Sequence, residues 1–151
     1  MSSKIADLLD GLELFRDFAY PELEIIGRYL TLEDAEEGKV IFKEGDPGNF
    51  MMILTVGRVN IYKYTDDGNQ LLACEVPGRV IGEMALLDHE RRSATCIADI
   101  DCEMLTFTQT NLKRLANDNP ALAYHFMYSL AGMLSRRLRR TSGIVADFLG
   151  H

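Results

Sequence analysis

The chain has 151 residues, of which 47% are hydrophobic, so it can bury a core as a single domain (residues 1–151) without disulfides or metals. Its net charge of −7 argues against a nucleic-acid-binding surface, and we expect no direct nucleic-acid contact. No apolar run approaches the roughly eighteen residues of a membrane span, and the N-terminus lacks a secretion signal, which predicts a cytoplasmic protein without membrane contact. Cys74, Cys96 and Cys102 lack metal-ligand spacing and are expected to be reduced thiols in the core.

Residues 1–30 are expected to form two short N-terminal helices. An amphipathic pattern predicts the first from Ile5 to Leu14. Proline is favoured at a first helical position, and apolar residues follow it on one face, which predicts the second from Pro21 to Leu30. Both helices are interpreted as packing caps on the domain.

From Leu32 the hydrophobic period changes to two, which indicates β-strands. Tight-turn sequences separate the strands at residues 45–48 and 66–69, the second a hairpin. Many short strands at regular spacing predict a mainly β fold, an antiparallel β-roll of the jelly-roll type over residues 31–108. The expected strands are Val40 to Phe42, Phe50 to Thr55, Arg58 to Tyr64, Gln70 to Val76, Ala94 to Ala98 and Cys102 to Phe107.

Residues 110–149 return to the helical period of 3.6. Thr108 or Thr110 can cap a helix that runs through Leu115. Asn119 followed by Pro120 is a helix start, and it predicts a long helix from Ala121 to Phe148.

This long helix carries a heptad seam of two sets of residues, each spaced by seven: Tyr124, Ala131, Leu138, Val145 and Met127, Leu134, Thr141, Phe148. The helix would be on the order of 40 Å long, more than a roll of this size can cover. We therefore favour a parallel homodimer through residues 121–148 over packing on its own domain. Gly143 is expected to end or bend the seam.

The stretch from Val80 to Thr95 contains the residue types of an anion site. Gly82 lets backbone approach a ligand closely, and the short helix expected after it would aim unpaired N–H groups outward. Arg92 offers a planar fork suited to two phosphate oxygens, and Glu83 offers acceptor oxygens suited to sugar hydroxyls. Taken alone, Arg92 could equally form a surface ion pair, and Glu83 could stabilise the helix start.

The stretch resembles the phosphate-binding cassette of cyclic nucleotide-binding domains in bacterial cAMP receptor proteins, cAMP-dependent kinase regulatory subunits and gated channels. The resemblance implies that Arg92 and Ser93 hold the cyclic phosphate and that Glu83 binds the ribose 2′-hydroxyl. Arg91 stands where the family usually has proline, which either loosens the turn or adds charge. The candidate ligand-binding residues in cassette 80–95 are Ile81, Gly82, Glu83, Met84, Ala85, Arg91, Arg92, Ser93 and Ala94.

Residues 136–142, Arg-Arg-Leu-Arg-Arg-Thr-Ser, resemble a second motif of bacterial cAMP receptor proteins. There the threonine and serine reach the adenine, one of them across the dimer, so Thr141 and Ser142 are candidate base contacts. The alternative for Thr141 is a hydrogen bond to a carbonyl of its own helix. The arginines of this run are expected to be a solvent-facing helix end in preference to a partner-binding patch.

An enzyme is not expected, and neither a catalytic residue nor a metal is predicted. The histidines are scattered without metal-ligand spacing, and the chain has no Gly-x-Ser-x-Gly elbow or Walker loop.

The sequence thus predicts a non-catalytic sensor of a cyclic purine nucleotide, cAMP in the first place and cGMP as an alternative, with no other cofactor. The nucleotide would couple to the arrangement of the C-terminal helix in a dimer. Two alternatives stay open. One is the effector part of a transcription regulator without its helix-turn-helix, since few residues follow Ser142. The other is an interaction module on the same fold that responds to no nucleotide and binds an unknown protein partner.

Overall fold

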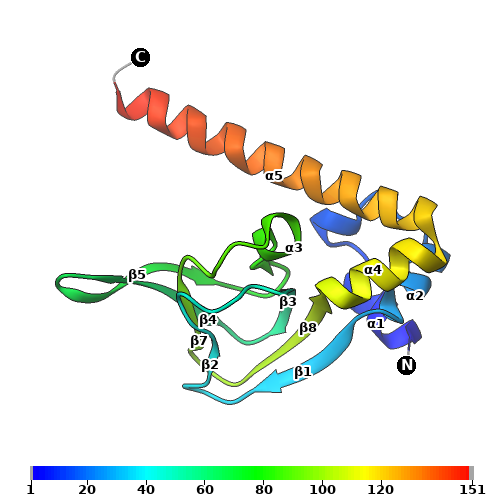
Figure 1. The fold of residues 1–151 in the computed structure, drawn as a ribbon, viewed down its shortest axis with the longest axis horizontal. Coiled ribbons are helices and arrows are strands. Elements are labelled where there is room, and N and C mark those ends of the chain that lie inside the picture. The colour runs from blue at the N-terminus through cyan, green and yellow to red at the C-terminus, as the bar shows by residue number, and fades with distance from the viewer. Residues whose placement is uncertain (1, 150–151) are drawn as a thin grey trace.

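The computed structural model describes residues 2–149, without the side chains of residues 2, 3 and 145–148. Two four-stranded antiparallel sheets form a β-roll, and helices gather at one end of it (Figure 1). One sheet has the order β1-β8-β3-β6 and the other β2-β7-β4-β5. The strands are β1 (Thr31–Ala35), β2 (Val40–Phe42), β3 (Phe50–Val56), β4 (Val59–Thr65), β5 (Gly68–Glu75), β6 (Val80–Ile81), β7 (Thr95–Ala98) and β8 (Cys102–Thr108). This confirms the predicted mainly β fold of the jelly-roll type.

The central strand β3 is buried on both faces, which explains its continuous apolar sequence. Its side chains alternate between two cores because successive residues of a strand point to opposite faces. Met51 and Ile53 belong to the core shared with the helices, and Met52 and Leu54 to the core between the sheets. The roll therefore has an apolar core between the sheets on one side of β3 and a helix-covered face on the other.

The helices are α1 (Ser2–Leu9), the 3₁₀ helix η1 (Glu13–Phe15), α2 (Tyr20–Gly27), α3 (Met84–Asp88), α4 (Gln109–Asp118) and α5 (Pro120–Phe148). The helix expected from Ile5 to Leu14 is wrong in its second half, because the chain turns after Leu9 and re-enters as η1. Strands β1 and β6 were not predicted. Thr108 caps α4 by accepting a bond from the Asn111 N–H at 3.0 Å, as expected.

Helix α5 begins as predicted, with the Asn119 side chain accepting a bond from the Leu122 N–H at 3.1 Å. Its first half packs on the domain, where Phe126 meets Phe107 edge to face with ring centroids 5.1 Å apart. The second half projects away from the roll (Figure 1). Gly143 does not end the helix, which continues to Phe148.

The heptad seam divides between two faces of α5. Met127 and Leu134 pack partly against the domain's own core, which contradicts a seam that faces only a partner. Tyr124, Tyr128 and Leu138 remain exposed at 69%, 69% and 68%. An apolar outer stripe is therefore left along the helix.

Cys96 and Cys102 are buried free thiols as expected, and burial raises the pKa of Cys96 to about 12. Cys74 is exposed on β5, so its assignment to the core was wrong. It lies at the edge of a sheet, where only one side of the strand is covered. Within residues 2–149, no helix combines the length and apolar character needed to cross a bilayer.

Gly57, in the β3–β4 turn, illustrates a position fixed by the fold. Its φ is +101°, and a Cβ there would lie 2.5 Å from the Asp101 carbonyl oxygen. Gly68 has a nearly identical φ of +98° but open space around it. Comparing a substitution at Gly68 with one at Gly57 therefore distinguishes the cost of backbone strain from the cost of steric overlap.

We expect Gly68→Ala to lower the free energy of unfolding by about 1 kcal/mol, from the left-handed backbone alone. Gly57→Ala should cost roughly 2 kcal/mol more, because overlap with buried atoms adds to the same strain. Urea unfolding of both variants beside the wild type measures the difference. Equal losses would contradict the close approach at Gly57.

Candidate ligand-binding site

A cavity of about 400 Å³ lies between the cassette, the roll and α5, within the size range of small-molecule sites. Of the predicted residues, the nine of the cassette all line it: Ile81, Gly82, Glu83, Met84, Ala85, Arg91, Arg92, Ser93 and Ala94. Arg137 lines it from α5, while Thr141 and Ser142 are exposed and do not. The structure thus brings the two ends of the cassette onto one cavity.

Arg92 is the most constrained residue of this cavity, with only 6% of its surface exposed. Its Nη2 donates to the Phe50 carbonyl at 2.6 Å and its Nη1 to the Gly82 carbonyl at 3.2 Å. The guanidinium carbon lies 4.1 Å from the ring centre of Phe42 and 4.7 Å from that of Phe50. Arg92 therefore does not form the surface ion pair that the sequence left open as an alternative.

The charge on Arg92 is only partly compensated. Its Nε has no hydrogen-bond partner among the described residues. Burial lowers the pKa of the Arg92 guanidinium, because desolvation penalises the charged form. A buried cation with a free donor beside a cavity favours a ligand that carries negative charge.

Gly82 is required by Arg92. It has a φ of +75°, and a Cβ at this position would overlap Arg92 Nη1. Two amides of the following turn are already used, because Ala85 N–H donates to Gly82 O at 3.2 Å and Leu86 N–H to Glu83 O at 3.1 Å. Helix α3 spans only Met84–Asp88, a short helix as predicted, so the dipole at its start is that of little more than one turn.

The loop at residues 45–48 holds the arginine end of the cassette. Gly45 N–H donates to the Arg92 carbonyl at 2.9 Å, and Arg92 N–H donates to the Asp46 carbonyl at 2.8 Å. Arg91 Nη1 donates to the Gly45 carbonyl at 2.9 Å. Arg91, in the place of a proline, therefore ties the turn to the neighbouring loop.

Glu83 makes an ion pair that sequence reasoning missed. Arg137 Nη1 of α5 donates to Glu83 Oε1 at 3.1 Å, and the two side chains are 27% and 13% exposed. Glu83 makes no capping bond at the start of α3 within the described chain. The carboxylate therefore links the cassette to the long helix.

The candidate residues Ser93 and Thr141 lie in different surroundings, one in the cavity lining and the other on the exposed part of α5. The Ser93 carbonyl accepts a bond from Lys63 Nζ at 2.7 Å, and Lys63 also pairs with Glu44 at 3.2 Å. A hydrogen bond from the Tyr64 N–H, followed by the one from Lys63, lowers the pKa of the Glu44 carboxyl group. Thr141 Oγ1 donates to the Arg137 carbonyl at 3.0 Å, the local bond that the sequence left open as an alternative.

Comparison with known proteins gives the family. The sequence model described as "Cyclic nucleotide-binding domain" matches residues 32–119, more than half of the chain. The chain therefore belongs to the family of cyclic nucleotide-binding domains. It is 33% identical over 132 residues to the cyclic AMP receptor protein of Thermus thermophilus, covering 87% of this chain and 59% of that protein.

Solved structures agree with this family. A cyclic nucleotide-binding domain from Methylobacillus flagellatus superimposes with a TM-score of 0.82 at 26% identity, covering 97% of this chain and 83% of that one. The Thermus thermophilus catabolite activator protein gives 0.78 at 31% identity, covering 91% and 62%. The chain spans 59% to 62% of the length of the first curated relatives that it matches.

We expect Arg92→Met to change the free energy of unfolding by less than about 1 kcal/mol without ligand. The variant leaves two carbonyls without donors, at about 1 kcal/mol each, but removes a desolvated charge and keeps an apolar stem between two rings. Urea unfolding of the ligand-free protein measures the effect. A loss of several kcal/mol would show that Arg92 serves the fold itself.

Proposed function

We propose that the chain is a non-catalytic sensor domain that binds a cyclic purine nucleotide, cAMP in the first place, in the cavity at Arg92. The buried guanidinium with its free Nε carries this proposal. A cyclic phosphate has one negative charge spread over two exocyclic oxygens, which suits a planar fork of donors. The name of the Thermus thermophilus cyclic AMP receptor protein supports cAMP as the first nucleotide to test.

Glu83 is proposed to bind the ribose 2′-hydroxyl while it keeps its bond to Arg137. A carboxylate has about four acceptor positions, so one oxygen can receive an N–H from Arg137 and the other a hydroxyl. The ligand would then add a contact at the junction of the cassette and α5. Its effect on α5 equals its differential affinity for the joined and separated arrangements.

The outer stripe of α5 supports a homodimer. Tyr124, Tyr128 and Leu138 leave large apolar surfaces exposed along one side of a helix whose opposite side is buried in the domain. In a parallel pair of such helices, Thr141 and Ser142 of each subunit would lie close to the other helix. That position supports a base contact shared between subunits.

Calorimetry with cAMP tests the site. We expect wild-type binding, and a loss of about 2 to 5 kcal/mol for Arg92→Met, the scale of removing one partner of a buried charged contact. Arg114→Met is the matched control, because it removes the same charge from an arginine that stacks on Tyr29, outside the cavity lining. Its affinity should equal that of the wild type.

Equal affinity of Arg92→Met and wild type would remove Arg92 from the phosphate site. No binding of either cAMP or cGMP by the wild type would favour the interaction module without a nucleotide.

The dimer is tested separately. Leu138→Glu should shift the cAMP-loaded protein towards monomer in sedimentation velocity, because a carboxylate in the helix seam must be desolvated on pairing. Ile100→Glu places the same charge on another exposed apolar position, in the β7–β8 turn, and should leave the sedimentation coefficient unchanged. Dimers of equal stability in both variants would contradict pairing through α5.

A further inference from the structure

His89 ends helix α3 in an unusual backbone conformation. With φ of 58° and ψ of 17°, it is the one non-glycine residue at positive φ in residues 2–149. Outside glycine this left-handed conformation is uncommon, and asparagine, aspartate and histidine adopt it more often than other residues.

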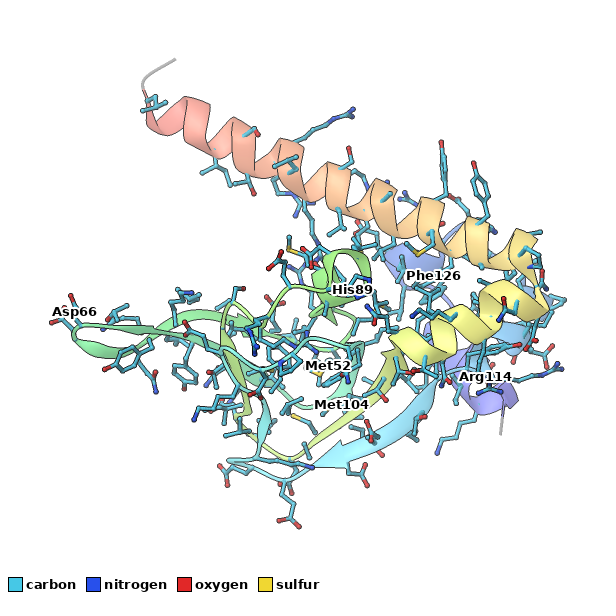
Figure 2. The ribbon with its side chains drawn as sticks, in the orientation of Figure 1. Met52, Asp66, His89, Met104, Arg114 and Phe126 are labelled. Atoms are coloured by element: carbon cyan, nitrogen blue, oxygen red, sulfur yellow. The ribbon has the colours of Figure 1, made fainter. Side chains whose placement is uncertain are left out.

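The ring contacts helix α4. His89 Nδ1 lies 2.7 Å from Nε2 of Gln109, the first residue of α4, and the same Nε2 lies 3.3 Å from the Ala85 carbonyl oxygen. Figure 2 shows His89 beside α3, close to the start of α4. The backbone N–H of Gln109 is fixed independently by the Asn49 carbonyl at 2.8 Å.

These contacts determine the protonation of the ring. A carbonyl oxygen only accepts, so the atom of Gln109 facing Ala85 must be the amide nitrogen. The second hydrogen of that amide then points to His89 Nδ1, which must accept it. Both contacts are hydrogen bonds only if the ring is neutral, with its proton on Nε2.

We propose that neutral His89 and Gln109 form a latch that holds cassette helix α3 against α4, and that protonation of His89 opens it and weakens nucleotide binding. Imidazolium has donors on both nitrogens, so Nδ1 and the amide nitrogen would oppose each other. Turning the amide offers its oxygen to the ring but withdraws the donor from Ala85. Both bonds hold only with a neutral ring.

The latch acts on the cavity because Ala85 belongs to its lining. It also reaches α5, since α4 ends at Asp118 and Asn119 caps the next helix. This regulation rests on the proposed function, because its effect on affinity requires a nucleotide in that cavity.

The charged groups nearest His89 along the chain are the carboxylates of Asp88 and Glu90 and the guanidinium of Arg91, which donates to the Gly45 carbonyl. Asp88 Oδ1 accepts the Glu90 N–H at 3.0 Å, and Asp46 of the adjoining loop accepts the Lys43 N–H at 3.1 Å. Arg137 of α5 pairs with Glu83 at the opposite end of α3. On α4 the nearest cation along the helix face of Gln109 is Lys113, one turn further. From another element, the uncharged Gln109 side chain is the group that contacts the His89 ring within residues 2–149.

His89→Asn is the matched variant. Asparagine tolerates the left-handed backbone, and its side-chain oxygen can accept from Gln109 without titrating. In ligand-free protein, the nuclear magnetic resonance signal of the Gln109 side-chain amide should move between about pH 8 and about pH 5.5, the usual range of histidine. It should stay constant in His89→Asn. A Gln109 amide signal that does not change with pH in the wild type would overturn the latch.

The affinity for cAMP supplies the second readout. We expect the wild-type Kd to rise about fivefold between the same two pH values, the scale of one hydrogen bond, and the His89→Asn Kd to change less than about twofold. Gln109→Glu should reverse the trend, because the introduced carboxylate pairs with imidazolium. A moving amide signal with parallel pH profiles in wild type and His89→Asn would overturn the positioning role. Absence of any cAMP binding at pH 8 would instead overturn the proposed function, while the amide signal still reports on the latch.

Discussion

The guanidinium of Arg92 is buried in the wall of the β-roll, and the surrounding residues are those that such a charge requires. Desolvation of the cation is unfavourable, and two carbonyls together with the faces of Phe42 and Phe50 offset it only in part. Gly82 lacks a side chain where Nη1 lies, and loop 45–48 fixes the backbone on either side. Phe42 comes from one sheet and Phe50 from the other, so the placement of the charge depends on how the two sheets pack.

What the sequence predicted follows from how local each signal is. The cassette was predictable because its glycine, carboxylate and arginine have fixed spacing within one segment. The packing of Arg92 between Phe42 and Phe50 was not predictable. Both rings are far from Arg92 in the sequence, and they contact it only after the sheets form. Strand β1 was missed because its Leu-Glu-Asp centre lacks apolar alternation and leaves it largely exposed, and β6 because two residues carry no period. Helix α3 is short, as predicted, and the N–H groups of Ala85 and Leu86 in its first turn bond to the carbonyls of Gly82 and Glu83.

Arg137 shows how a visible pattern was misassigned. It was placed with its arginine neighbours on a solvent-facing helix end. The buried stripe of α5 contains Phe126, Leu130 and Met133, and the next step at helical spacing is position 137. Continuing the stripe would have turned this arginine towards the domain, where it meets Glu83. Arg137 thus belongs to the inner face of α5, whereas Leu138 belongs to the outer one.

The proposed ligand is an anion, whereas the protein has a net charge of −7. The distance over which each charge acts therefore decides whether the two repel. The cavity is also lined by Glu75, Glu83, Asp88 and Glu90. Three of these have local partners: Glu75 pairs with Arg79, Glu83 with Arg137, and Asp88 with the Glu90 N–H. Charges elsewhere on the surface are screened beyond about 8 Å at physiological ionic strength, whereas a buried contact is screened far less. For the proposed ligand, the short-range attraction of a desolvated guanidinium would therefore outweigh the diffuse repulsion, and the overall charge would act mainly on the rate at which the ligand arrives.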